Sequence, residues 1–462
     1  MVRPDLQSET YALAMKAPRL RIATTQFLIQ FIAVFAFFSL LLQSGCEQSG
    51  REVSELSPAL SPDADSSSDE GLQGRGVLVR ADRNDASNRP DEIEKWPTSK
   101  VSPPDPLSKR QSGPSPRVPT QFVPGFPSDP RPPLVALQLA DSTLLGVPIG
   151  RYSDLTFLMR NDGTILSVPK AHILKESVLQ DRFQTILHKE LAQQLREEYG
   201  KRYSVKQEHP YLIVAAPQHI ERWADRFRTL HHSVNLYCST HGIPHRPLEF
   251  PLVAIVFATR VEFLRAAKST TSKVPDSLAG FYSIDSNRIY LYESIDDSTE
   301  ETLDTICHEA AHQLAFNMGL HQRRAATPLW IAEGFATMFE SPKLSGFQNR
   351  QGKSLWPTAR RMNWHSLAKT PKAVEQIVSS LVRNDKLFES DAQNAYTVAW
   401  AMTVTLSQRR SPQFSQYLQR VAHLPPFETY ESSQRWKDFQ GAFGSDVGLL
   451  TNSILKYLDA LE

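Results

Sequence analysis

Residues Ile306–Leu314 read Ile-Cys-His-Glu-Ala-Ala-His-Gln-Leu. Apolar residues recur at helical spacing through and beyond this stretch, and Gly319 follows the last of them, so the sequence predicts a helix that ends there. On a helix, His308 and His312 lie one turn apart on the same face. Two imidazoles placed in this way can bind one zinc ion at about 2.0–2.1 Å each. Glu309 is rotated by about 100° from the first histidine, so it can reach a water on the metal without binding the metal itself.

A third candidate ligand lies in residues Thr327–Ala336, which read Thr-Pro-Leu-Trp-Ile-Ala-Glu-Gly-Phe-Ala. Thr327 suits an N-cap and Pro328 suits the first helical position, so a second helix is predicted to begin here. Glu333 then lies one to two turns into the helix among apolar residues, where an unpaired carboxylate would be costly. A zinc ion shared with the two histidines removes that cost. Catalytic zinc takes three protein ligands and keeps one position open, and this set of donors meets that requirement.

The two stretches resemble the gluzincin metallopeptidases, and most closely the peptidase-MA-like domains of secreted bacterial proteins and lipoproteins. The resemblance covers roughly residues 203–461, and its motifs are His308-Glu309-x-x-His312 and Trp330-x-x-Glu333-Gly334-x-Ala336. It implies that His308, His312 and Glu333 bind zinc, and that Glu309 is the general base that activates water for attack on a peptide bond.

The resemblance also suggests an oxyanion donor, because Tyr396 falls about where related gluzincins place a tyrosine that stabilises the tetrahedral intermediate. A tyrosine that only packs in the core is the alternative. His321, in the connector between the two helices, is either an alternative ligand or an ordinary polar loop residue. Residues Ile289–Tyr292 form either an edge strand that pairs with an extended peptide or a strand inside a sheet.

Two departures from related enzymes narrow the expectation. Thermolysin-like enzymes place an acid four residues after the ligand glutamate to orient a histidine, but that position is Thr337 here, so the supporting group must come from elsewhere. The Gly-x-Met-Glu-Asn signature of the large aminopeptidases is absent, and Gly-Phe-Tyr-Ser stands in that region at residues 280–283. The glutamate of that signature anchors the free amine of the substrate in aminopeptidases. Its absence here favours an endopeptidase over an aminopeptidase.

Outside these motifs, the order of elements predicts an α+β fold. Short apolar or alternating runs between residues 134 and 175 predict a small β-module, with a hairpin turn at Asn161-Asp162-Gly163. A connecting helix is expected over residues 176–202, because apolar residues from Leu179 to Leu195 keep helical spacing. Residues 203–462 are expected to form the gluzincin-like domain, with a small mixed sheet followed by a helical C-terminal half.

The N-terminal region indicates secretion and attachment to a membrane. An apolar run over Phe27–Leu42 has the length of a signal-peptide core, and Leu-Leu-Gln-Ser-Gly precedes Cys46. Small residues before a lone cysteine resemble the bacterial lipobox, which implies a signal over residues 1–45, a lipid on Cys46 and a location at the cell envelope, outside the cytoplasm. An uncleaved membrane anchor is the alternative. Residues 46–133 contain fifteen of the chain's 32 prolines with many Ser and Asp, which predicts a disordered tether.

Composition excludes several other classes of protein. Of the 462 residues, 51 are Lys or Arg and 50 are Asp or Glu, and the sequence has no local excess of basic residues. This balance argues against nucleic acid as a partner. Three cysteines exclude a disulfide-rich scaffold and a multi-thiolate zinc module. The sequence thus predicts a membrane-tethered zinc peptidase with a peptide or protein substrate. The alternative is a non-catalytic envelope lipoprotein that uses a peptidase-like fold as a zinc-stabilised binding scaffold.

Overall fold

The computed structural model describes residues 132–461, apart from 271–273, 276–277, 294–299 and 348–353. The signal segment, Cys46 and nearly all of the expected tether lie outside the described residues, so these expectations stay predictions. Within the described part of the chain, no helix has the length and apolar character needed to cross a membrane.

The first sheet is antiparallel throughout and has the strand order β4-β3-β2-β1-β5. Its strands are β1 (Leu134–Gln138), β2 (Thr143–Arg151), β3 (Leu155–Met159), β4 (Ile165–Pro169) and β5 (Lys175–Gln180), with the short 3-10 helix η1 (Lys170–His172) before β5. The predicted hairpin turn joins β3 to β4, where Gly163 takes a φ of 83°. That left-handed backbone conformation is readily available to glycine, which explains the Asn-Asp-Gly sequence at the turn.

The connecting helix predicted over residues 176–202 is wrong in its first half. Residues Lys175–Gln180 form β5, which pairs with β1, and the helix α3 covers only His188–Tyr199 before a 3-10 turn, η2 (Gly200–Arg202). The apolar spacing misleads because it runs through three different structures. Leu179 is exposed on the strand, Phe183 is buried beneath the first sheet, and Leu191 is buried against the second sheet.

The second sheet is mixed and has the strand order β6-β7-β8-β10-β9. Its strands are β6 (Ser204–Glu208), β7 (Tyr211–Ala215), β8 (Leu252–Phe257), β9 (Gly280–Ser283) and β10 (Arg288–Tyr292). The strand β8 runs parallel to β7 and to β10, whereas β9 runs antiparallel to β10. The edge-strand hypothesis for Ile289–Tyr292 is therefore wrong, because β10 lies inside the sheet and β9 lies at its edge.

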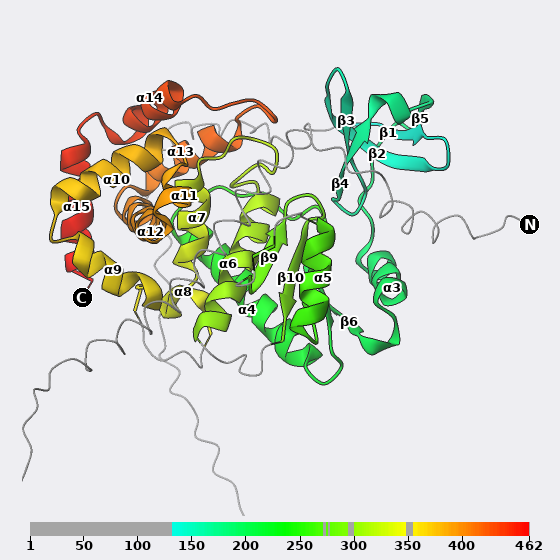
Figure 1. Cartoon of the computed structure of the whole chain (residues 1–462), viewed down its shortest axis with the longest axis horizontal. Coiled ribbons are helices and arrows are strands. Elements are labelled where there is room, and N and C mark those ends of the chain that lie inside the picture. Colours follow the sequence, from blue (N-terminus) through cyan, green and yellow to red (C-terminus); the bar gives the residue numbers. More distant parts are fainter. Residues whose placement is uncertain (1–131, 271–273, 276–277, 294–299, 348–353, 462) are drawn as a thin grey trace, which may run out of the picture. The chain divides into compact units, whose positions relative to one another are not determined.

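Helices cover both faces of the second sheet because its central strands are apolar on both sides. Along β7, Tyr211 and Ile213 pack in the core cluster that includes α4 (Ile220–Thr240), whereas Leu212 and Val214 pack in the cluster that includes α5 (Arg260–Thr270). Figure 1 shows α5 on one side of β9 and β10 and α6 on the other. One face of the sheet thus packs against α6, the helix that carries the histidine motif.

From Glu300 onward the regular elements of the described chain are all helices, which confirms the α+β class. Its helices are α6 (Glu300–Asn317), α7 (Leu329–Met338), α8 (Pro342–Ser345), α9 (Thr358–Leu367), α10 (Pro371–Arg383), α11 (Leu387–Ser390), α12 (Ala392–Arg409), α13 (Ser411–Ala422), α14 (Ser432–Phe443) and α15 (Val447–Asp459). The N-cap of α7 is Pro328 instead of Thr327, one residue later than predicted. In Figure 1 the later helices gather around α12.

The helix α7 has no exposed residue and crosses α12 at close range. A Cβ atom at Gly334 would collide with the backbone of Ala399 and the hydroxyl group of Thr403 on α12. Glycine is therefore required at this position for the two helices to approach each other. This contact fixes α7 at the centre of the fold and with it the neighbouring residue, Glu333.

Candidate metal centre

The helix α6 places the two motif histidines side by side. His308 and His312 are both buried, and their ring centroids are 4.6 Å apart. Their Nε2 atoms are 3.0 Å apart. Two nitrogen donors therefore converge on one point, as expected for residues four positions apart on one helical face.

The helix α7 brings the carboxylate of Glu333 to the same point. Its Oε2 atom lies 3.2 Å from Nε2 of His308 and 3.4 Å from Nε2 of His312. One donor atom from each of these three residues lies within 4.8 Å of the other two, and all three side chains are buried. This group could therefore hold a metal ion, and among the described residues it is the only group of at least three such donors.

The histidines and carboxylates of the centre shift one another's pKa values. Burial disfavours the charged imidazolium of His308, but hydrogen bonds and charges from Glu333 and Glu340 outweigh burial and raise the pKa of His308 to about 10. Burial alone would raise the pKa of Glu333, but the positive charge and hydrogen bonds of the two histidines hold it well below its usual range. The two carboxylates thus stabilise a positive charge between them at His308.

The sequence did not identify Glu340 as a residue of the site. Its carboxylate contacts His308 at the ring nitrogen that does not face the other donors. Its Oε1 atom lies 2.8 Å from Nδ1 of His308, and its carboxylate also pairs with Arg360 of α9 at 3.6 Å. Burial opposes the charge of Glu340, but Arg360 and then His308 lower its pKa. A carboxylate on Nδ1 fixes the imidazole so that Nε2 points toward the centre. Glu340 therefore supplies the support that Thr337 cannot.

Glu309 does not belong to the three converging donors, and one of its carboxylate oxygens binds the second sheet. Its Oε2 atom accepts a hydrogen bond of 2.6 Å from the backbone N–H of Tyr282 in β9. Burial raises the pKa of Glu309, although the charges of His308 and His312 act against this shift. A carboxyl group with a raised pKa beside a metal centre is suited to taking up a proton.

Tyr396 lies close to the same donors. Its ring is 6.2 Å from the ring of His308 between centroids, and the guanidinium group of Arg360 lies 5.1 Å from its ring centre. Burial raises the pKa of Tyr396 well above its usual value, and the charge of Glu333 and a hydrogen bond to it add to this shift. The hydroxyl group therefore stays protonated and can donate a hydrogen bond at the centre.

His321 does not belong to the converging donors, which corrects its expectation as an alternative ligand. Its ring lies between Phe316 and Phe335, at 5.5 and 6.0 Å between centroids. Burial lowers the pKa of His321 to about 3, and the charge of His312 adds to the effect. His321 lies in the connector, as the alternative expected, but it is buried and neutral and packs between α6 and α7.

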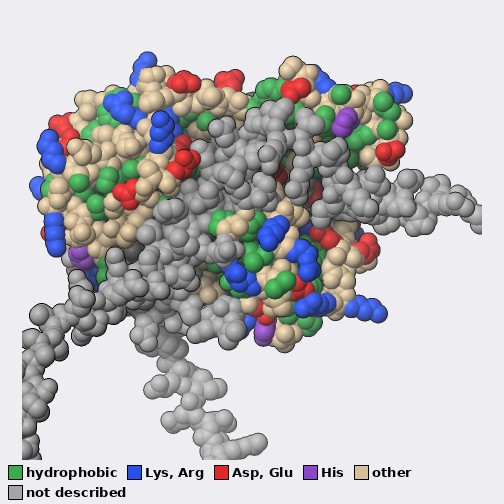
Figure 2. Space-filling model, viewed as in Figure 1, with side chains coloured by type: hydrophobic (Ala, Val, Ile, Leu, Met, Phe, Trp, Pro, Cys, Tyr) green, Lys and Arg blue, Asp and Glu red, His purple; other side chains and the backbone are tan. Residues whose placement is uncertain are grey.

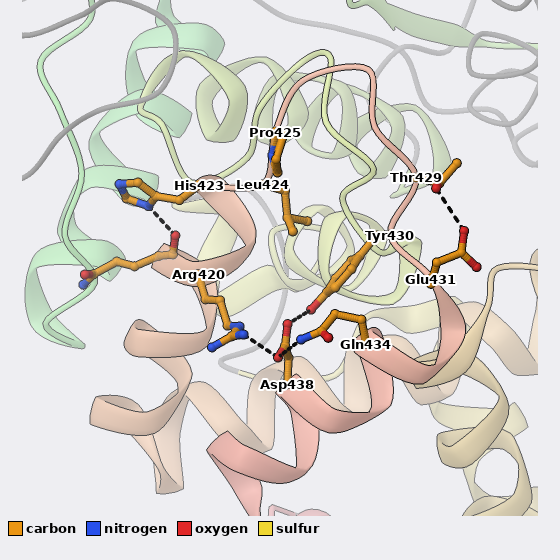
Figure 3. Close-up of a pocket in the computed structure, with 10 residues that line it drawn as sticks. Arg420, His423, Leu424, Pro425, Thr429, Tyr430, Glu431, Gln434 and Asp438 are labelled. Carbon is orange, nitrogen blue, oxygen red and sulfur yellow. Dashed lines mark hydrogen bonds and ion pairs between the residues drawn. The ribbon is translucent and has the colours of Figure 1, made fainter.

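A hollow of about 590 Å³ lies between the end of α13 and the start of α14 (Figure 3). Its buried carboxylate, Asp438, accepts hydrogen bonds of 2.7 Å from Tyr430 and from Gln434, and it pairs with Arg420 at 2.6 Å. The protein's own donors thus surround this carboxylate.

On the face drawn in Figure 2, the described residues present both Lys or Arg and Asp or Glu side chains. This distribution agrees with the balance of 51 basic and 50 acidic residues in the whole chain.

Comparison with known proteins gives a partial and distant match. A family described as a protein of unknown function (DUF1570) matches residues 302–428, which include most of α6 and all of α7 and α12. No curated protein matches the chain. Among solved structures, an M1 zinc metallopeptidase mutant from Deinococcus radiodurans bound to a Tyr-Ser-Ala substrate is similar over 55% of this chain and 51% of that chain, with 13% identity and a TM-score of 0.29. The same mutant enzyme, in a second structure, gives the same coverage and identity and a TM-score of 0.28. The match thus spans about half the length of those structures.

Proposed function

We propose that the chain is a zinc-dependent peptidase of gluzincin type, and that it cleaves peptide bonds within a peptide or protein substrate at the cell envelope. One observation carries the proposal: His308, His312 and Glu333 converge in a buried site while Glu309, beside them, is held outside the donor set. A structural zinc site usually has four protein ligands and needs no base. Three donors with an adjacent carboxylate are typical of hydrolytic zinc sites.

The donor set fits zinc by its chemistry. Two imidazole nitrogens and one carboxylate oxygen are common ligands of catalytic zinc, and the bond from Glu340 to Nδ1 of His308 leaves Nε2 to face the ion. When bound, zinc would polarise the substrate carbonyl group and lower the pKa of a water toward about 7.

The remaining chemistry falls to the chain's own side chains. Glu309 takes the proton from the attacking water and passes it to the leaving amine. Its raised pKa favours this uptake. The hydroxyl group of Tyr396, which stays protonated, donates a hydrogen bond to the carbonyl oxygen as negative charge develops on it. Arg360 stacks on Tyr396 and pairs with Glu340, so it supports both of these groups from one position.

The proposal is tested with the full-length chain and zinc. The chain should bind about one zinc ion and cleave internally quenched peptides whose two ends are blocked. A chelator should abolish cleavage, and added zinc should restore it.

A Tyr396→Phe variant should keep the zinc and lose roughly 10²–10³-fold in kcat. Unchanged kcat would make Tyr396 a packing residue.

For the wild-type chain, cleavage only of peptides with a free N-terminus would exclude the endopeptidase. Bound zinc without cleavage of any peptide would favour the scaffold alternative.

A Glu340→Gln substitution should lower zinc affinity by roughly 10–100-fold, because it removes the charge that holds His308 in place. The measurement is competition for zinc against a coloured chelator. Glu389→Gln, an exposed position on α11, is the matched control and should leave the affinity unchanged. Equal affinity in the Glu340 variant would show that His308 is held without this carboxylate.

A further inference from the structure

Three polar residues form a buried stripe along the face of α6 that meets the second sheet. Glu309, Gln313 and Asn317 are spaced by four residues and therefore lie above one another on the helix. Buried polar side chains are costly unless they are hydrogen-bonded, so their partners define what the stripe does.

All three residues bind the hairpin formed by β9 and β10. Glu309 accepts a hydrogen bond from the backbone N–H of Tyr282, as described above. Gln313 donates from Nε2 to the backbone oxygen of Asn287 at 2.8 Å and to that of Val253 at 3.1 Å. The stripe thus connects the metal-binding helix to the edge of the sheet at successive turns of the helix.

Asn287 closes the network at the hairpin turn. Its Oδ1 atom accepts hydrogen bonds of 2.8 Å from Nδ2 of Asn317 and 2.8 Å from the hydroxyl group of Tyr282, and its own Nδ2 donates to Oδ1 of Asn317 at 3.0 Å. Its φ of 58° places it in the left-handed region, which asparagine tolerates better than most residues. A closed circuit therefore runs from Glu309 along α6 to Asn317, then to Asn287, to Tyr282 and back to Glu309.

The other side of the same turn is held by the first sheet and by the connector between α6 and α7. The backbone N–H of Ile165 in β4 donates to the carbonyl oxygen of Asp285 at 2.7 Å. Arg323 donates to the carbonyl oxygens of Ile284, at 3.2 Å, and Gly163, at 2.8 Å. The turn is thus fixed from two directions.

We infer that Asn287 and Asn317 are positioning residues that set the Glu309 carboxylate through Tyr282. The strand β9 cannot slide along α6 without breaking both bonds of Tyr282, the one from its backbone N–H and the one from its hydroxyl group. Packing alone does not require this arrangement, because replacing both partners of a buried hydrogen bond by apolar groups of the same shape can be nearly neutral for stability. The inference rests on the proposed function for its effect on catalysis.

The test uses the full-length chain and the variant Asn287→Gly. Glycine accepts the left-handed backbone and keeps the carbonyl oxygen that Gln313 binds, so only the side-chain bonds to Tyr282 and Asn317 are lost. Asn317→Ala removes the same circuit from the helix side. Asn235→Ala on α4, where Nδ2 donates to the carbonyl oxygen of His231 at 2.9 Å, is the control for losing a half-buried asparagine elsewhere.

Both variants should keep the wild-type zinc content and KM while kcat falls by roughly 10–100-fold, because a small misplacement of a catalytic group is costly. The double variant should be no slower than the slower single variant, since both break one circuit. Amide hydrogen exchange at Tyr282 should become faster in each variant and stay unchanged in Asn235→Ala. Wild-type kcat in Asn287→Gly, or additive losses in the double variant, would overturn the inference.

The exchange measurement separates this inference from the proposed function. If the wild-type chain cleaves no peptide, the proposed function fails, and exchange at Tyr282 alone decides the circuit. Faster exchange in both variants would then support a circuit that holds Tyr282 against Glu309. Unchanged exchange would overturn it.

Discussion

A Glu309→Gln variant is expected to bind zinc as well as the wild-type chain and to cleave peptides roughly 10²–10⁴-fold more slowly. Glutamine has nearly the same shape, and its amide oxygen can still accept the N–H of Tyr282 that holds Glu309 at 2.6 Å. The side chain therefore stays in place but loses the capacity to accept a proton. Zinc content and kcat, measured on the same preparation, check both halves of the prediction.

The control for Glu309→Gln is Glu262→Gln on α5. Glu262 also accepts hydrogen bonds, from Tyr203 and Thr259, but it belongs to no part of the metal centre. This variant should keep full activity. Full activity in Glu309→Gln would remove Glu309 as the general base, and loss of zinc from it would show that Glu309 contributes to metal binding.

A Glu333→Ala variant is expected to lose its zinc on dialysis. Glu333 supplies the only carboxylate oxygen of the converging donors, and it neutralises charge beside both histidines. The loss of a direct ligand should weaken binding by more than the roughly 10–100-fold expected for a supporting group such as Glu340. Zinc per chain and the competition assay provide the measurement, and His308→Ala should behave in the same way.

The fold of Glu333→Ala is checked separately, because the substitution leaves a space in a helix with no exposed residue. Far-ultraviolet circular dichroism should remain at the wild-type level in the zinc-free state. A folded variant that still binds one zinc ion with wild-type affinity would exclude Glu333 as a ligand.

The converging donors could be predicted from sequence because their geometry is local. The spacing of His308 and His312 fixes their relation on any helix, and the second motif needs only one further helix to bring Glu333 near. Glu340 could not be predicted in this way. It lies two residues beyond the end of α7, and its partner Arg360 belongs to another helix, so no single pattern contains both.

The errors in the strands have two origins. The edge strand β9 has four residues and lies in a region rich in turn-forming residues, so its local signal is weak. The strand β5 is recognisable only through its pairing with β1, about forty residues away in sequence. Long-range pairing decides β5 and the hairpin with β10 decides β9, and local periodicity records neither.

The crossing of α7 and α12 at Gly334 has a consequence for evolution. A side chain at Gly334 would meet the backbone of Ala399 and the side chain of Thr403, so positions 334 and 403 cannot vary independently. In related sequences, a side chain at the position of Gly334 should occur only together with a smaller residue at the position of Thr403 and a wider separation of the two helices. Such a separation would also shift Glu333, the adjacent residue. Lineages that keep the carboxylate in register should therefore keep the glycine, whereas lineages that have lost the carboxylate should be free to replace it.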